Sequence, residues 1–114
     1  MISNRITNNN EFKDVYESYK QSKRFIEFAN KEKGVFHDSA VMTEEVAVRK
    51  KLIFNFECSM ALLDDDYRDI LQKEINNEDS LWYVGVISRS TFYRNRQKAI
   101  EIFLHNFHRL ETLQ

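Results

Sequence analysis

The segment from Ser88 to Phe107, SRSTFYRNRQKAIEIFLHNF, begins with side chains that could bind nucleic acid. Its first eleven residues hold four basic side chains and no acidic one: Arg89, Arg94, Arg96 and Lys98. Guanidinium and amide groups match the hydrogen-bonding edges of DNA bases, while cationic and hydroxyl groups bind phosphates. The segment then becomes apolar, so a single helix is expected to expose a basic start and to bury an apolar stripe.

Two kinds of DNA contact are expected from the first turns of this helix, because arginine suits guanine and glutamine suits adenine. Base-edge or groove contacts are expected of Arg89, Ser90, Arg94 and Gln97. Phosphate contacts are expected of Tyr93, Arg96 and Lys98. Thr91 is left open between a DNA contact and support of the turn. The alternative is an amphipathic helix whose charges only face solvent.

The ends and the buried side of this helix are predicted from local patterns. Ser88 is the expected N-cap, because a serine hydroxyl accepts a hydrogen bond from the unpaired amides of a first turn. The buried row steps by 7, 4, 4 and 3 residues to the expected helix end at about Leu110: Phe92, Ala99, Phe103, Phe107 and Leu110, flanked by Ile100, Ile102 and Leu104. With this row facing the core, the basic side chains of the first turns are expected to point outward.

A short helix and a tight turn are expected directly before Ser88. Asp79 or Ser80 can cap a two-turn helix that ends at Val84, and Gly85 lies where a turn between helices needs a small residue. A strand over LWYVGVI is possible from residue propensities, but it would lack a partner strand. A capped short helix, a turn and a basic helix together favour a helix-turn-helix.

An acidic stretch precedes this unit. Seven acids stand there against Arg68 and Lys73: Asp64, Asp65, Asp66, Asp69, Glu74, Glu78 and Asp79. The run of three aspartates could suggest a metal site, but it lacks the glycine and the loop that fold several oxygens around a cation. It is better explained as the N-cap and first turn of a short helix from Tyr67 to Ile75, ended by the two asparagines that follow.

The N-terminal half is expected to form two long helices. The first runs from Glu11 to about Lys33, after a polar start in which one of Asn8–Asn10 supplies the cap. Its apolar positions follow helical spacing and are expected to pack in a core or a dimer: Phe12, Val15, Tyr16, Tyr19, Ile26 and Ala29. The second runs from Thr43, its expected N-cap, to about Leu63.

Composition favours an all-α protein. The chain of 114 residues contains no proline and only two glycines, whereas sheets with many turns recruit both residues. Charged residues make up 31% of the chain and recur at helical spacing. The net charge of −1 gives no overall nucleic-acid signature, so a DNA-binding surface must be local.

Other kinds of chemistry find little support in the sequence. The single cysteine, Cys58, cannot form an internal disulfide, which fits a reducing compartment, and no apolar run suits a signal peptide or a membrane span. His105 and His108 have the spacing of a metal pair but no further ligand nearby, and the chain has no phosphate-binding loop. We therefore expect a cytoplasmic protein that is not an enzyme and that carries no cofactor or metal.

The C-terminal half resembles a known family. The segments ALLDDDYRDIL and, above all, SRSTFYRNRQKAIEIFL are similar to the helix-turn-helix of phage late-gene transcriptional activators of the ArpU/RinA type. They more distantly resemble region 4 of bacterial sigma factors, and proteins of small-genome mollicute bacteria carry similar signatures. The positions that match the motif are Ser88, Thr91, Phe92, Tyr93, Arg94, Lys98, Ala99 and Ile100. The resemblance implies sequence-directed DNA binding, often beside RNA polymerase.

We predict an all-α protein of about five helices in two parts. Residues 1–63 form two long helices for packing, oligomerisation or partner binding, and residues 64–114 form a sigma region 4-like helix-turn-helix. The predicted function is transcription regulation through double-stranded DNA, with RNA polymerase and a second copy of the chain as candidate partners. The alternatives are a protein-interaction module that docks on RNA polymerase or another partner without reading DNA, and a structural helical dimer.

Overall fold

The computed structural model of the chain describes residues 2–31, 40–76, 85 and 87–113, and every regular element within these ranges is an α-helix. The described helices are α1 (Ile2–Lys31), α3 (Ala40–Ala61), α4 (Asp65–Ile75) and α5 (Arg89–Thr112). The all-α prediction is confirmed, whereas the short helix expected before Gly85 lies outside the described residues. Within the described ranges, no helix has both the length and the apolar character needed to cross a membrane.

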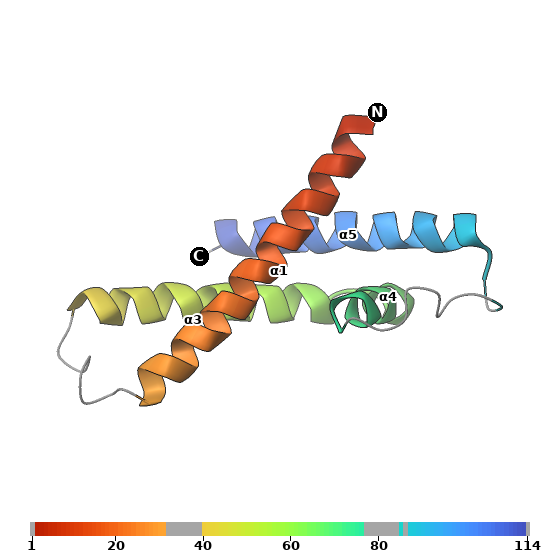
Figure 1. The fold of residues 1–114 in the computed structure, drawn as a ribbon. Coiled ribbons are helices and arrows are strands. Elements are labelled where there is room, and N and C mark those ends of the chain that lie inside the picture. The colour runs from red at the N-terminus through yellow and green to blue at the C-terminus, as the bar shows by residue number, and fades with distance from the viewer. Residues whose placement is uncertain (1, 32–39, 77–84, 86, 114) are drawn as a thin grey trace.

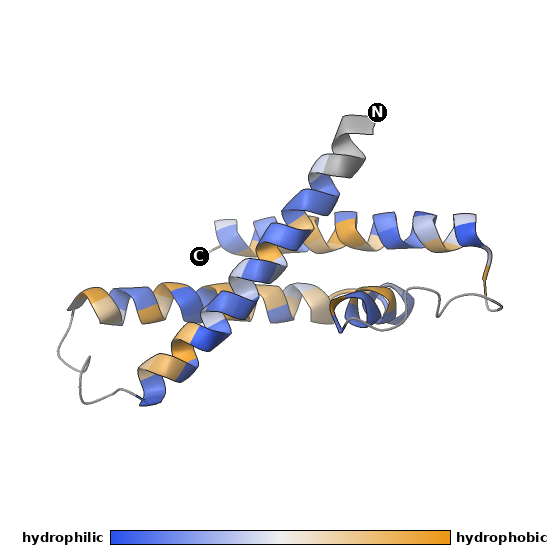
Figure 2. Cartoon of the chain, in the orientation of Figure 1, coloured by the Kyte–Doolittle hydropathy of each residue, from blue (hydrophilic) through white to orange (hydrophobic). Residues whose placement is uncertain are grey.

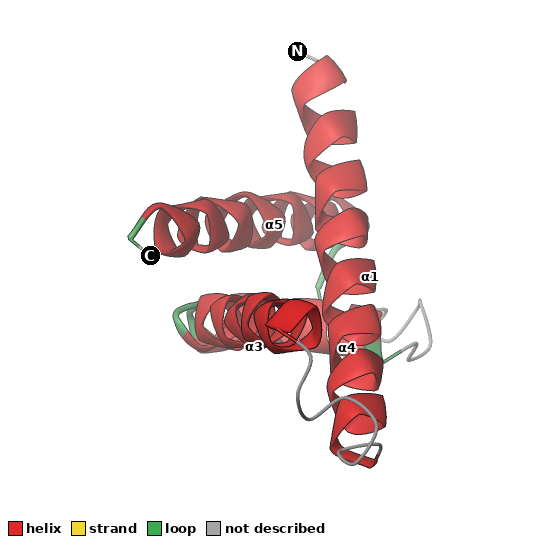
Figure 3. Cartoon of the chain, turned by 90° about the vertical axis from the view of Figure 1, so that its left-hand side faces the viewer, coloured by secondary structure: helices red, strands yellow, loops and turns green. Residues whose placement is uncertain are grey.

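The helices pack in two layers. α3 and α5 run antiparallel to each other, and α1 crosses both of them (Figures 1 and 3). α4 follows α3 after a short turn, lies nearly end-on to the viewer in Figure 1, and packs against α5. α1 crosses the C-terminal half of α5, so the first turns of α5 lie away from this crossing (Figure 1).

A single main core contains side chains from all four described helices and from both sides of position 63. Its buried members are Phe12, Phe56, Met60, Leu63, Leu71, Ala99, Ile100, Phe103, Leu104 and Phe107. The fully buried ring of Phe103 lies 5.2 Å from the ring of Phe12 on α1 and 5.1 Å from that of Phe56 on α3. Val15, Tyr16 and Tyr19 pack against this core, so the apolar stripe of α1 serves core packing, as expected.

Two tyrosine hydroxyls of α1 fix its position on the neighbouring helices. The hydroxyl of Tyr16 donates to the backbone oxygen of Ile75 at the end of α4, at 3.2 Å. The hydroxyl of Tyr19 donates to Glu57 on α3, at 2.9 Å. Burial, followed by this hydrogen bond, raises the pKa of Tyr19 to about 12, so the hydroxyl remains a donor at neutral pH.

Both N-terminal helices begin earlier than the sequence predicts. α1 starts at Ile2 rather than at Glu11, so none of Asn8–Asn10 is its cap, and α3 starts at Ala40 rather than at the expected cap Thr43. An asparagine destabilises a helix interior by only about 0.7 kcal/mol relative to alanine. Because the first ten residues include no proline or glycine, nothing in them interrupts the helical backbone.

The start of α4 agrees more closely with its prediction. Asp64 occupies the N-cap position, with Asp65 and Asp66 in the first turn, although the Asp64 side chain makes no capping hydrogen bond. α4 therefore starts two residues before Tyr67 and ends before Asn76, as the asparagines suggested. Acids in the first turn stabilise a helix through its dipole, which explains the acidic run without a metal ion.

Arg68 connects α4 to the end of α3. Its guanidinium donates to the backbone oxygens of Met60, Ala61 and Leu63 at 3.1, 2.8 and 2.6 Å, and pairs with Asp65 at 3.0 Å. The last carbonyls of a helix have no partner within that helix, so an external donor is needed there. The charge of Arg68 also opposes the negative end of the helix dipole of α3.

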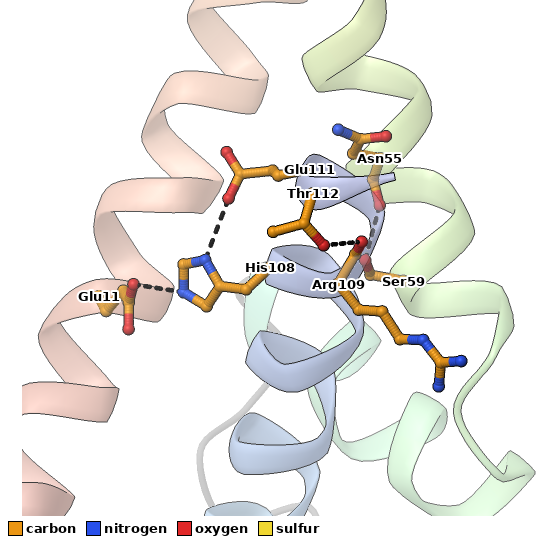
Figure 4. Close-up of polar contacts among 7 residues, drawn as sticks. All are labelled: Glu11, Asn55, Ser59, His108, Arg109, Glu111 and Thr112. Atoms are coloured by element: carbon orange, nitrogen blue, oxygen red, sulfur yellow. Dashed lines mark hydrogen bonds and ion pairs between the residues drawn. The ribbon is translucent and has the colours of Figure 1, made fainter. Parts of the chain in front are cut away.

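His108 connects the C-terminal part of α5 to α1. Its Nε2 lies 2.6 Å from Oε2 of Glu11, and its Nδ1 lies 3.0 Å from Oε1 of Glu111 (Figure 4). A protonated imidazole can donate to both carboxylates, whereas a neutral one can donate to only one. Burial lowers the pKa of His108, but the hydrogen bonds to Glu111 and Glu11 together outweigh it and raise the pKa above its ordinary value of 6.5.

This link between α1 and α5 is expected to weaken as the pH rises. Because the pKa is raised in the folded chain, protonated His108 stabilises the fold fully below the unfolded pKa, and this contribution is lost as the pH rises through the folded pKa. The melting temperature of His108→Gln should therefore fall furthest below that of the wild type near about pH 6 and least near about pH 8.5. Thermal melts across this range test the link.

The matched control is His105→Gln, which changes an exposed histidine on the same helix. Its melting temperature is expected to follow that of the wild type at every pH. A gap between wild type and His108→Gln that stays constant with pH would show that protonation does not strengthen the link.

Candidate nucleic-acid interface

The start of α5 is fixed by a capped turn. Ser88 is the N-cap, as predicted, and its hydroxyl accepts a hydrogen bond from the Thr91 amide at 3.2 Å and donates to the Thr91 hydroxyl at 2.7 Å. Thr91 thus supports the turn. Gly85 lies in a turn before this cap with a φ of 85°, a conformation that side chains with a Cβ rarely adopt. Local sequence therefore determines where α5 begins.

Two contacts hold the first turns of α5 against α4. Ile70 and Phe92 form a small buried cluster, against which Ile87 packs. One turn further along, Arg96 Nε and Nη2 lie 2.9 and 2.6 Å from Oε1 of Glu74. An apolar contact and an ion pair together hold the start of α5 against α4.

The side chains that remain exposed here form two short rows on neighbouring faces of α5. Arg89 and Tyr93 are four residues apart, and the Arg89 guanidinium carbon lies 5.7 Å from the centre of the Tyr93 ring. Ser90, Arg94 and Lys98 form the second row at the same spacing, and all three are exposed. Figure 2 shows the first turns of α5, at the right-hand end of the helix, as mainly hydrophilic. These five residues are called the basic start of α5 below.

Arg96 was expected to contact phosphate, but its guanidinium is bonded to Glu74. Its side chain is only 19% exposed, so the ion pair replaces most of its contact with solvent. Releasing Arg96 to a phosphate would leave Glu74 without this partner beside the polyanion. Arg96 therefore helps to position α5 against α4.

Gln97 was expected to face outward, and this prediction is wrong. Its side chain is 8% exposed, and its amide donates weakly to Glu101 at 3.4 Å. Gln97 lies one turn before Ile100 and two turns before Leu104, which are both buried. The buried face of α5 is therefore wider than the predicted row, which is itself buried at Phe92, Ala99, Phe103 and Phe107 and half-buried at Leu110.

The five residues of the basic start include three cations and no acid. Within the described residues, Arg94 and Lys98 make no ion pair, whereas two acids of α4 are paired: Glu74 with Arg96 and Asp69 with Lys73. The N-terminus of α5 adds a partial positive charge from its unpaired amides. An anion that approaches this end of α5 therefore meets exposed cations and hydrogen-bond donors.

Glu74 and Ile87 contribute to this surface by positioning it, and neither is evident from the sequence pattern. Glu74 meets Arg96 across 22 residues of chain, and no helical spacing relates the two. Ile87 is a single apolar residue before the cap, and only the fold shows that it packs beside Ile70 and Phe92. The sequence offers one hint of this contact: Glu74 and Arg96 carry opposite charges on two neighbouring helices.

The described residues include no cluster of three or more histidine, cysteine or acidic side chains with the geometry of a metal site. Asp64–Asp66 are all exposed, and His108 uses both ring nitrogens for carboxylates. The free thiol of Cys58 is half-buried on α3.

Comparison of the chain with protein-family models, with curated proteins and with solved structures finds no match.

Proposed function

We propose that the chain binds double-stranded DNA through the basic start of α5 and acts as a transcription regulator. The observation that carries the proposal is the presence of Arg89, Ser90, Tyr93, Arg94 and Lys98 together on the exposed first turns of one capped helix. A helix of this kind fits the width of the major groove. The resemblance of this segment to phage activators supports the same function and suggests RNA polymerase as a further partner.

The five residues have distinct roles in this proposal. The guanidinium groups of Arg89 and Arg94 offer paired donors that suit the two acceptors of guanine, with Ser90 as a nearby donor to a base edge. Lys98 and the hydroxyl of Tyr93 contact phosphates and set the position of the helix. Gln97 is left out of the contact set because it is buried, whereas Arg96 holds α5 against α4 through Glu74.

The test compares DNA affinities at low salt by fluorescence anisotropy, with a mixed-sequence duplex pool as probe. The variant Arg89→Ala, Arg94→Ala, Lys98→Ala is expected to bind more than about tenfold more weakly than the wild type, because it loses three cations that face the polyanion together. The matched control replaces three exposed cations on α1 and α3 with alanine: Lys13, Arg24 and Lys50.

The control lowers the net charge by the same amount, so it measures the effect of charge alone. It should retain most of the wild-type affinity. Equal weakening in the two triple variants would mean that DNA attraction is diffuse, and the basic start would then have no special role.

A second candidate function is protein interaction without DNA readout. Three adjacent acids at the start of α4 are exposed, and the Asp65 side chain is 95% exposed despite its contact with Arg68. A partner with a basic surface, such as a subunit of RNA polymerase, would suit them. Pull-down from nuclease-treated extract separates the two functions. If partners survive the nuclease but are lost when Asp64–Asp66 are changed to asparagine, protein interaction is favoured. If the nuclease removes all partners, DNA binding is favoured.

A further inference from the structure

The apolar side of α3 continues past the end of α5. Asn55 and Ser59 are buried, and Figure 4 shows both beside the last turns of α5. Val48 and Leu52 precede them on the same face at helical spacing, yet Val48 is 59% exposed. α3 and α5 are antiparallel, and α5 does not cover the part of α3 that extends beyond its end. Val48 is therefore exposed although it lies on the same face of α3 as Asn55 and Ser59. Leu113, the C-cap residue of α5, is 72% exposed.

A groove of about 240 Å³ lies between these two helix ends. Its lining residues are Val48, Lys51, Leu52 and Asn55 from α3 and Phe107 and Glu111 from α5. The groove is thus apolar at its base, with a cation contributed by one helix and an anion by the other. Among the described residues, Lys51 has no ion pair, and Glu111 uses only one carboxylate oxygen, for His108.

We propose that a second copy of this chain docks in this groove around a twofold axis. A twofold interface uses the same surface on both copies. If one residue of the first copy contacts a different residue of the second copy, the same pair therefore forms again with the copies exchanged. A surface with one cation and one anion meets this condition, since Lys51 can pair with Glu111 of the partner subunit and the reverse pair forms at the same time. Val48, which lines the same groove, supplies apolar contact beside the charges.

A partner of a single charge would fit this surface less well, because either Lys51 or Glu111 would face a like charge. The dimer also leaves the basic start of α5 exposed, since the groove lies at the opposite end of α5 (Figure 1). Two such helices could then contact DNA together, as in dimeric helix-turn-helix proteins. Dimerisation itself does not depend on DNA binding.

The test measures molar mass without nucleic acid, by sedimentation equilibrium over a range of concentrations. The wild type should rise from 13.7 kDa toward twice that mass as concentration increases. Val48→Asp places a carboxylate in the apolar contact and should weaken dimerisation by about tenfold or more, which corresponds to about 1.4 kcal/mol. Phe54→Asp is the control, because Phe54 is an exposed apolar residue of α3 outside the groove.

Charge exchange tests the pairing itself. Lys51→Glu alone should weaken dimerisation, and adding Glu111→Lys should restore it, because both pairs re-form with their charges reversed. The masses are compared near about pH 8.5, where the bond between His108 and Glu111 contributes least to the fold. Far-ultraviolet circular dichroism confirms that each variant is helical. The proposal is overturned if the wild type keeps the monomer mass at every concentration, if Val48→Asp dimerises like the wild type, or if the double exchange restores nothing.

Discussion

Phe103→Ala is expected to destabilise the fold by about 3–5 kcal/mol, the range for removing a large aromatic side chain from a core. The ring is fully buried and has aromatic neighbours on three helices: Phe12 on α1, Phe56 on α3 and Phe107 on α5 itself. Since small domains have a total stability of about 5–15 kcal/mol, this single change removes a large share of it. Urea unfolding followed by circular dichroism measures the loss.

The control for this prediction is Phe54→Ala. It removes the same atoms from α3, but Phe54 is 55% exposed, so the loss should be below about 1 kcal/mol. A Phe103→Ala protein as stable as Phe54→Ala would mean that α1, α3 and α5 do not share one core.

Arg68→Ala is expected to have the second-largest effect, about 2–3 kcal/mol. Hydrogen bonds to a charged donor each contribute about 1.5–3 kcal/mol, and removing Arg68 leaves three backbone oxygens at the end of α3 without this donor. The expected destabilisation is smaller than the sum of these hydrogen bonds, because the Arg68 side chain is 35% exposed and water can replace part of its bonding. Arg68→Lys should recover less than half, since an ammonium cannot reproduce the planar guanidinium fork.

Arg94→Ala provides the comparison, because it removes an exposed arginine that has no ion pair within the described residues. Its stability should lie within about 0.5 kcal/mol of the wild type. Equal stability of Arg68→Ala and Arg94→Ala in urea would exclude a structural role of Arg68 at the turn between α3 and α4.

The features that the sequence predicts well are those determined by neighbouring residues. The spacing of Phe92, Ala99, Phe103 and Phe107 identifies the central buried row of α5, because a helix places these side chains on one face. Ser88 is recognised as the cap because its hydroxyl reaches the amide only three positions later. The absence of proline, together with only two glycines, similarly indicates the all-α class.

The features that it does not predict depend on contacts between distant parts of the chain. Arg96 is bonded to Glu74 across 22 positions, and His108 to Glu11 across 97. No periodic pattern relates such partners, so Arg96 resembled an exposed cation until the fold placed Glu74 beside it. Arg68 likewise resembled a surface charge within an acidic stretch.

Gln97 shows a limit of a different kind. Periodicity gives the centre of a buried face but not its width, which depends on how neighbouring helices surround it. Ile100 and Leu104 are also buried, so the buried face extends to Gln97. The start of α1 shows a related limit: three asparagines suggest a cap, but a polar residue also continues a helix at little cost.

The salt dependence of DNA affinity tests the proposed role of the basic start of α5 most directly. Each phosphate neutralised by a cation contributes about −0.9 to the slope of log affinity against log salt concentration. The wild type should therefore bind duplex DNA with a steep negative slope, and the Arg89→Ala, Arg94→Ala, Lys98→Ala variant should have a slope shallower by about 0.9 or more, because it lacks the phosphate contact of Lys98. Equal slopes for the two proteins, or no binding by the wild type at low salt, would contradict DNA binding through α5.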